Sequence, residues 1–391
     1  MRKKFTALLC HALLFCLFSL AVFSSCASAE TLGFGIVNAP DVAIRKDAAG
    51  KRITRLPEGT CVWITGSKSD NAGDLWYHVL AQDSSADRHP VYDGWMKAEF
   101  VDAGSRLWHD IQAVKASAYA MIVLKNDGTV SCAGDWTYCD PKDQYTGLRD
   151  IRQIGLVTIG CGFYAVDGNG RLYRDGEPAG IADRIRLAGS LDLICITEDN
   201  RLLGTYGAGT GIGWIYPRDS AEVSLEHVTA MAEYDFRYLF LTDDGTVYSA
   251  YRDDPALDYP EPDWASWTDV AGIDVSCCSF GTEMFNGRMR TKYVPAFAAV
   301  RKDGTVLAAP EELAALTAGW QGIRKVAVGS YWVLGLKQDG TVVTAGIAGN
   351  TPPDVSSWTD ITDISYGHTY CVGLKQDGSL VFAGNYHFNE D

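Results

Sequence analysis

A repeat of about 40 residues constrains the fold of this chain more than any other feature. Each of seven units has an aliphatic residue near its start, and in four of them a tight turn follows 17 residues later. The aliphatic residues and the turn residues that follow them are Ile111 and Gly128, Ile151 and Gly170, Ile185 and Asn200, Val228 and Gly245, Val270 and Gly304, Ile323 and Gly340, and Ile361 and Gly378. Asp-Gly between alternating apolar residues is a strong hairpin signal, because both central positions of such a turn need positive φ. The repeat therefore predicts an array of small sheets in place of one mixed core.

The last unit is the best formed and contains Trp358, Ile361, Gly367, His368, Leu374, Asp377 and Gly378. The units resemble the repeats of the regulator of chromosome condensation family, whose fold is a seven-bladed β-propeller. The resemblance weakens in units two and three, where Asn169 and Asn200 stand at turn positions and the Gly-x-x-His step is missing. It implies a seven-bladed propeller over residues 105–391, in which His368 is a blade-packing residue and each turn Asp serves its turn.

Residues 1–29 have the composition of a secretory signal peptide. Three basic residues precede an apolar run from Phe5 to Phe23, and Ala27-Ser28-Ala29 forms a cleavage site of small residues. The apolar run also approaches the length of a short membrane span, so an uncleaved anchor is the alternative. Cys26 follows Phe23-Ser24-Ser25, which resembles a bacterial lipoprotein box, and lipidation at Cys26 is a further alternative. Each of these alternatives predicts an extracytoplasmic protein.

Charge and cysteine usage exclude several classes of function. Without residues 1–29 the chain has 31 Lys and Arg against 49 Asp and Glu, a net charge of −18, which disfavours nucleic acid as a partner. Eight cysteines remain, and no C-x-x-C pair supports a zinc site. Cys132 and Cys139 flank a short loop and could form a disulfide, although small buried thiols are the simpler interpretation. We expect no metal and no cofactor.

Residues 33–102 show four short segments of alternating apolar residues, which predict a small, strongly bent barrel of about five strands. The segments run from Val42 to Arg45, Leu56 to Ile64, Leu75 to Val79 and Gly94 to Val101. Their order resembles the bacterial SH3 domain, with Ala43 where that family has Asn. The resemblance implies that a groove of aromatic residues binds cell-wall peptide or another extended ligand. The candidates are Trp63, Tyr77, Tyr92 and Trp95, although Trp76 and Trp95 could instead fill the barrel core.

Three connectors between the units depart from the repeat. In unit five the interval from Val270 to Gly304 is 34 residues, and Asn286-Gly287 within the insertion predicts an extra hairpin. A Gly-rich connector spans residues 207–217, and an acidic, aromatic one spans residues 253–267. Aromatic residues on surface loops are common anchors for binding. The candidate partner-binding residues are Trp214, Tyr216, Tyr259, Trp264, Phe285, Arg288, Arg290 and Tyr293.

The fold class predicted from these features is all-β, with a small SH3-like barrel followed by a seven-bladed β-propeller. No catalytic triad or metal cluster stands out among the residues. We therefore expect an exported, non-catalytic, monomeric binding protein whose propeller loops hold a protein partner. Its SH3-like module would hold peptidoglycan peptide, and it would touch a membrane only through a lipid anchor. The alternatives are an inhibitor of a secreted enzyme such as a β-lactamase and, less favoured, an envelope hydrolase or lyase.

Overall fold

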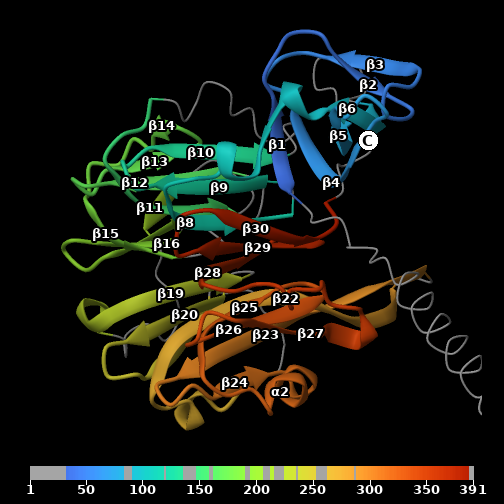
Figure 1. Ribbon diagram of the computed structural model, residues 1–391. Helices are drawn as coiled ribbons and strands as arrows, with labels where there is room; N and C mark the ends of the chain where they lie inside the picture. Colours follow the sequence, from blue (N-terminus) through green and yellow to red (C-terminus); the bar gives the residue numbers. More distant parts are fainter. Residues whose placement is uncertain are drawn as a thin grey trace, which may run out of the picture. The chain divides into compact units, whose positions relative to one another are not determined.

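A computed structural model describes residues 32–82, 90–118, 120–134, 147–157, 162–189, 194–205, 212–214, 224–234, 237–251, 262–285 and 288–386. The described residues are mostly strands joined by turns and short 3-10 segments (Figure 1). Their one α-helix is α2, Glu311–Thr317. The signal-peptide prediction and Cys26 lie outside the described residues, as do Cys139, Tyr216 and Tyr259.

An antiparallel sheet of seven strands forms the N-terminal part of the described chain. Its strands are β1 (Gly33–Val37), β2 (Val42–Arg45), β3 (Arg52–Leu56), β4 (Cys61–Ser69), β5 (Leu75–Gln82), β6 (Val91–Lys97) and β7 (Val101–Ala103), in the spatial order β3-β2-β6-β5-β4-β1-β7. Alternating apolar residues of these strands make one core cluster, which includes Ile44, Val62, Val79 and Met96. The sheet has two strands more than the five expected, because β1 and β7 flank the predicted segments.

Seven small antiparallel sheets follow within the described residues. The first four are β8 (Ile111–Ala116), β9 (Ala120–Lys125) and β10 (Val130–Gly134); β11 (Ile151–Val157), β12 (Gly162–Asp167), β13 (Leu172–Arg174) and β14 (Glu177–Pro178); β15 (Ile185–Ala188), β16 (Ile194–Thr197), β17 (Leu202–Thr205) and β18 (Ile212–Trp214); and β19 (Val228–Tyr234), β20 (Arg237–Thr242) and β21 (Val247–Tyr251).

The other three sheets are β22 (Val270–Phe285), β23 (Arg288–Arg301) and β24 (Val306–Ala309); β25 (Ile323–Val328), β26 (Trp332–Lys337) and β27 (Val342–Gly346); and β28 (Ile361–Tyr366), β29 (Tyr370–Lys375) and β30 (Leu380–Gly384). The first strand of every sheet begins at one of the seven aliphatic residues of the repeat. The predicted start of each unit is therefore confirmed, and we refer to the sheets as blades one to seven.

The turn residues of the repeat join each blade to the next. At six of the seven blade boundaries, the backbone N–H of the first strand residue donates to the carbonyl of the preceding turn glycine, at 2.8–3.1 Å. The last of these bonds runs from Ile111 of blade one to Gly378 of blade seven, at 3.1 Å, and closes the ring. The described blades therefore form a closed β-propeller. The turn aspartates serve their turns as expected, since Asp377 Oδ1 accepts from the Ser379 N–H at 2.9 Å.

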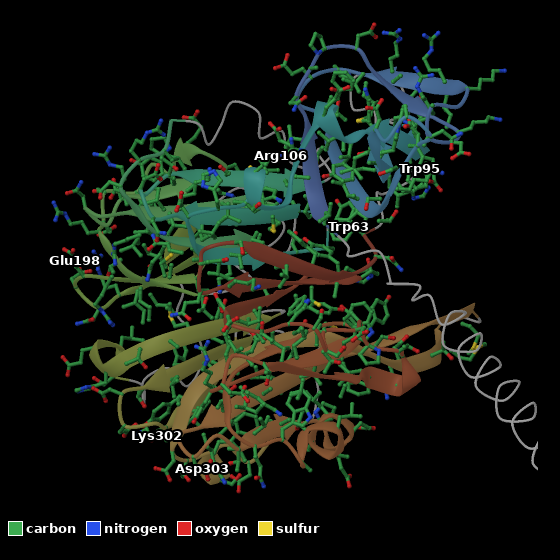
Figure 2. All side chains as sticks on the ribbon, in the orientation of Figure 1. Trp63, Trp95, Arg106, Glu198, Lys302 and Asp303 are labelled. Atoms are coloured by element: carbon green, nitrogen blue, oxygen red, sulfur yellow. The ribbon has the colours of Figure 1, made fainter. Side chains whose placement is uncertain are left out.

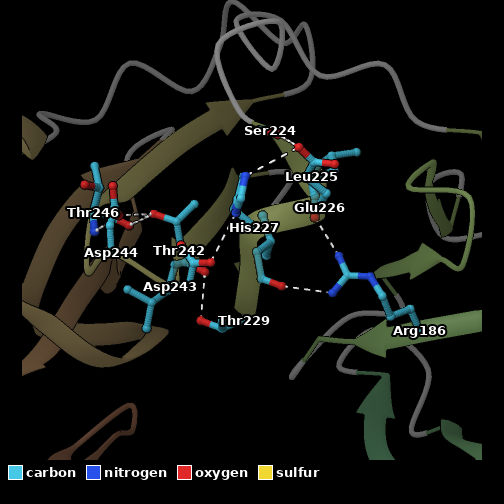
Figure 3. A network of polar contacts seen from close by, with 12 residues as sticks. Arg186, Ser224, Leu225, Glu226, His227, Thr229, Thr242, Asp243, Asp244 and Thr246 are labelled. Carbon is cyan, nitrogen blue, oxygen red and sulfur yellow. Dashed lines mark hydrogen bonds and ion pairs between the residues drawn. The ribbon is translucent and has the colours of Figure 1, made fainter.

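An arginine strengthens the boundary at which the turn glycine is missing. Asn200 stands at the turn position of blade three, and no bond of the same kind joins it to Val228 among the described residues. Arg186 donates instead to the carbonyls of Val228, at 3.1 Å, and Leu225, at 2.6 Å (Figure 3). Arg152 and Arg324 make similar bonds to the first residue of the next blade. An Arg directly after the aliphatic residue thus marks a hydrogen bond to the next blade, and the repeat pattern alone did not reveal it.

We expect Gly378→Ala to lower the free energy of unfolding by about 1–2 kcal/mol or more, because an alanine there must adopt left-handed backbone. Gly378 has a φ of +80°, and a Cβ added to it would lie 3.0 Å from the Ile111 nitrogen. Gly349 shares this φ but has no atom within 4 Å of an added Cβ, so Gly349→Ala is the matched control. Urea denaturation of both variants measures the difference. Equal losses would contradict a role for close packing at the ring closure.

The N-terminal sheet packs over the boundary between blades one and seven. Phe34 and Trp63 of the sheet are fully buried against Tyr370, Phe382 and Tyr386 of the last blade and its C-terminal extension. Ring centroids of Phe34 and Tyr386 lie 4.8 Å apart, and those of Trp63 and Tyr370 lie 5.4 Å apart. Trp108, ahead of blade one, donates from Nε1 to the Phe34 carbonyl at 2.8 Å. We call this group of aromatic residues the closure cluster.

Candidate functional site

The four aromatic residues predicted to form a groove in the N-terminal sheet do not lie together. Trp63 is 0% exposed in the closure cluster, so its predicted role in ligand binding is wrong. Tyr77, which we expected to be exposed, is buried, and Tyr92 packs against the same core cluster. Side chains alternate between the two faces of a strand, and Trp95 pairs with His78 on the face opposite Tyr77. The four predicted residues are therefore divided among the closure cluster, the core of the N-terminal sheet and the opposite face of that sheet.

Trp95, labelled in Figure 2, contacts a lysine and a histidine. The Lys68 ammonium lies 3.8 Å from the ring centroid of Trp95, and the His78 ring centroid lies at 4.9 Å. This arrangement is a cation–π contact on a partly exposed tryptophan. Trp76, by contrast, is buried and donates from Nε1 to Asp70 at 2.9 Å, in line with the core role expected for it.

The aromatic residues predicted on two connectors are only partly described. Trp214 ends β18, where its backbone pairs with Leu203. Trp264 lies in a short 3-10 segment and packs edge-on against Trp267, at 5.0 Å, and Phe297, at 5.2 Å. The Asp263 side chain accepts from the Ala265 N–H and holds this segment in place. Trp264 is therefore a half-buried packing residue of blade five, and its role in partner binding stays a prediction.

The insertion in unit five extends the hairpin of blade five, where we had predicted an additional hairpin. Strands β22 and β23 pair from Val270 and Arg301 to Phe285 and Arg288, with register shifts between Val270 and Gly272 and between Ser279 and Thr282. Figure 1 shows these two strands reaching beyond the neighbouring strands. Arg290 and Tyr293 lie in β23. Met284 and Met289 are opposite each other near the tip, and they are 66% and 63% exposed.

A cavity of about 360 Å³ lies among the first strands of the blades. Its lining includes Lys115 of β8, Asp274 of β22, Lys325 of β25, and Ser365 and Tyr366 of β28. Lys115, Asp274 and Ser365 each follow the aliphatic residue of their unit by four positions, where four other units have Gly155, Gly189, Ala232 and Ala327. The Tyr164 ring fills the space beside Gly155 and Ile194 fills that beside Gly189, whereas Ala327 borders the cavity itself. We call this cavity the central cavity.

Most charged groups of the central cavity are already paired. Lys325 and Asp363 form an ion pair, and Asp363 also accepts from the Ile364 N–H at 2.9 Å. Asp274 accepts from the Val328 N–H at 2.7 Å, and burial raises the pKa of its carboxyl to about 6. The Arg324 guanidinium donates to the Ile361 and Thr362 carbonyls. Lys115 makes no ion pair or hydrogen bond through its side chain within the described residues, and repulsion from Lys325 followed by burial lowers its pKa.

His368 has the packing role expected of it. Its Nε2 lies 3.3 Å from the Tyr331 hydroxyl of the preceding blade, and the Tyr366 hydroxyl donates to its carbonyl at 2.6 Å.

Cys132 carries a free thiol in the structure. Among the described residues, no group of three or more His, Cys, Asp or Glu is placed to hold a metal ion. No helix in the same part of the chain is long and apolar enough to cross a membrane.

No protein-family model matches the chain, and neither does any curated protein. The solved structures that match the chain have low sequence identity to it and low TM-scores. The CRINKLY WD40 ectodomain of the Arabidopsis thaliana receptor kinase ACR4 is 12% identical, with 71% of this chain and 99% of that chain covered and a TM-score of 0.43. Prp20p from Saccharomyces cerevisiae is 12% identical, with 93% of each chain covered and a TM-score of 0.35. BamB from Moraxella catarrhalis is 14% identical, with 72% and 96% covered and a TM-score of 0.36. The propeller assignment rests on the seven sheets and their closure.

Proposed function

We propose that this chain is an exported, non-catalytic binding protein that holds a protein partner at the tip of the β22–β23 hairpin. The observation that carries the proposal is the cross-strand pair Met284 and Met289, each about two-thirds exposed. Large apolar side chains at such exposure are uncommon among the described residues, and unbranched Met adapts to varied apolar surfaces. A paired strand framework holds both side chains at the end of one blade.

The sequence around the methionine pair suggests the chemistry of the partner. Strand β23 contains Arg288, Arg290 and Lys292 near the tip, whereas β22 contributes Glu283. This local excess of basic residues stands out in a chain whose net charge is −15. Complementary charges raise association rates and select partners. The proposed partner therefore presents an apolar patch with an acidic rim, and an enzyme secreted to the same compartment is one class that fits.

Export is part of the proposal because of the composition of residues 1–29. The SH3-like assignment of residues 33–102 is also retained as a proposal, with a smaller binding role than the four-residue groove implied. Trp95, with Lys68 over its ring, is the exposed aromatic position at which an extended peptide would stack. The main contribution of the N-terminal sheet is then to cover the ring closure.

We expect the double variant Met284→Ser and Met289→Ser to weaken partner binding about 100-fold, since burying two methionines contributes a few kcal/mol. A photo-crosslinking residue at position 289, in cells of the native host, identifies the partner. Calorimetry with that purified partner then measures the affinity of each variant. The fold should be unaffected, because both side chains are largely exposed.

The matched control changes two exposed apolar residues of the N-terminal sheet. Ile53 and Leu75 are 39% and 45% exposed. Ile53→Ser with Leu75→Ser therefore also removes exposed apolar side chains, at positions far from the hairpin in the sequence. This control should bind the partner as the unchanged chain does. Equal affinity of both double variants, or equal crosslinking from positions 75 and 289, would overturn the assignment of the hairpin tip.

A further inference from the structure

We propose that the central cavity binds a small organic anion, with its carboxylate or phosphate group between Lys115 and Lys325. This site is separate from the hairpin tip and does not depend on the function proposed for it. Lys115 is the residue that points most directly to a ligand. Its ammonium group lines a cavity and has no direct partner within the described residues. Lys115 is partly buried, and an ammonium group that loses part of its water is stabilised when a counter-charge or hydrogen bonds replace that water.

The charges around Lys115 favour an anion over a cation as the ligand of the cavity. Lys325 is close enough to Lys115 that their repulsion is the largest influence on the Lys115 ammonium. The Asp363 carboxylate is already occupied by Lys325 and by the Ile364 N–H. The Asp274 carboxyl is held by the Val328 N–H, and its burial favours the neutral form. An anion between the two ammonium groups would offset their repulsion, whereas a cation would add to it.

The volume and lining of the central cavity suit an organic anion. A volume of about 360 Å³ exceeds what a bare inorganic ion fills. The lining also contains apolar side chains from four blades, Leu156, Ala230, Ile273 and Ile364. A ligand with one anionic group and a compact apolar body matches this lining. The Ser365 Oγ accepts from the Ala116 N–H at 2.9 Å, which links β28 to β8 in the wall of the cavity.

The test uses the whole chain and four probes. Benzoate and phenyl phosphate represent the two anionic groups, benzamide is the neutral analogue, and inorganic phosphate is the bare ion. We expect calorimetry to show that benzoate, phenyl phosphate or both bind, with benzamide and inorganic phosphate at least tenfold weaker. Preference between the two anions identifies the group that the cavity holds. Failure of both organic anions to bind at millimolar concentration would overturn the proposal.

Matched variants separate a binding role of Lys115 from a structural one. Lys115→Gln removes the charge and keeps most of the side-chain length, and it should weaken anion binding at least tenfold without lowering the melting temperature. Lys302→Gln changes an exposed turn lysine of blade five and should bind anions normally (Figure 2). Unchanged affinity in Lys115→Gln would overturn the proposal. Binding should also weaken as alkaline pH removes the Lys115 proton, in a cavity whose other charged groups are Lys325, Arg324, Asp274 and Asp363.

Discussion

Replacement of Trp63 by alanine is expected to lower the free energy of unfolding by about 3–5 kcal/mol, the range for a fully buried aromatic residue. Trp63 is 0% exposed, and its ring meets those of Phe34, Tyr370, Phe382 and Tyr386. The edge-on pairs with Phe34, Tyr370 and Phe382 contribute beyond the area that they bury. The loss should appear in urea denaturation followed by circular dichroism.

Two further substitutions sharpen this prediction. Trp63 Nε1 is buried and has no hydrogen-bond partner among the described residues, so Trp63→Phe loses no bond and should be destabilised by only about 1–2 kcal/mol. Trp95→Ala, at a partly exposed position of the same sheet, should be milder than Trp63→Ala. A Trp63→Ala variant as stable as Trp95→Ala would show that the closure cluster is not the packed core described above.

Replacement of Asp274 by asparagine is expected to stabilise the protein by about 1–3 kcal/mol near pH 8, since Asp274 is partly exposed and water screens part of the penalty on its charge. The carboxyl has a pKa of about 6 in the fold, against an ordinary value of 3.8, chiefly because it is buried. Asparagine keeps an oxygen that can accept from the Val328 N–H at the same place. The substitution therefore removes an unfavourable buried charge while leaving the hydrogen bond intact.

The sign of the pH dependence follows from the raised pKa of Asp274. A group with a raised folded-state pKa is most favourable below its unfolded pKa, and its contribution is lost as pH rises through the folded value. The advantage of Asp274→Asn should therefore be less than about 1 kcal/mol near pH 4 and grow up to about pH 6–7. Urea denaturation across this range gives the comparison.

Asp339→Asn is the contrasting control for this experiment. Hydrogen bonds from Thr341 lower the pKa of the exposed Asp339 carboxyl, so its contribution is present at neutral pH and lost as pH falls. Asp339→Asn should accordingly bring no gain near pH 8. If Asp274→Asn were no more stable than the unchanged chain near pH 8, the Asp274 carboxylate would be well solvated or neutralised by the neighbouring lysines.

The repeat could be predicted from sequence because its signals are local. Each aliphatic residue begins a blade, and each turn glycine has the positive φ that its turn requires. The spacing of 34 residues in unit five also located the hairpin that carries Met284 and Met289. These features depend on residues close together in the chain, where turn geometry and alternation of apolar residues act directly.

The closure cluster and the central cavity could not be predicted in the same way. The resemblance of its segment to an SH3 motif predicts that Trp63 lines a groove, but Tyr370 and Tyr386, more than 300 residues further along the chain, help to bury it. Lys115 and Asp274 become neighbours of one cavity only when blades one and five are placed around a ring. Alignment of the seven units on their aliphatic residues would have shown both at the same register position.

The closing hydrogen bond between Ile111 and Gly378 has a consequence for the order of folding. Phe34 and Trp63 precede all seven blades in the chain, so they have no cover until blade seven, which carries Tyr370 and Phe382, has formed. Bringing such distant segments together is a slow step, because the whole array between them must be confined first. Until then an apolar edge stays open to other chains, and aggregation competes with closure. We therefore expect the apolar faces of Phe34 and Trp63 to stay exposed until the strands of blade seven, from Ile361 to Gly384, have joined the ring.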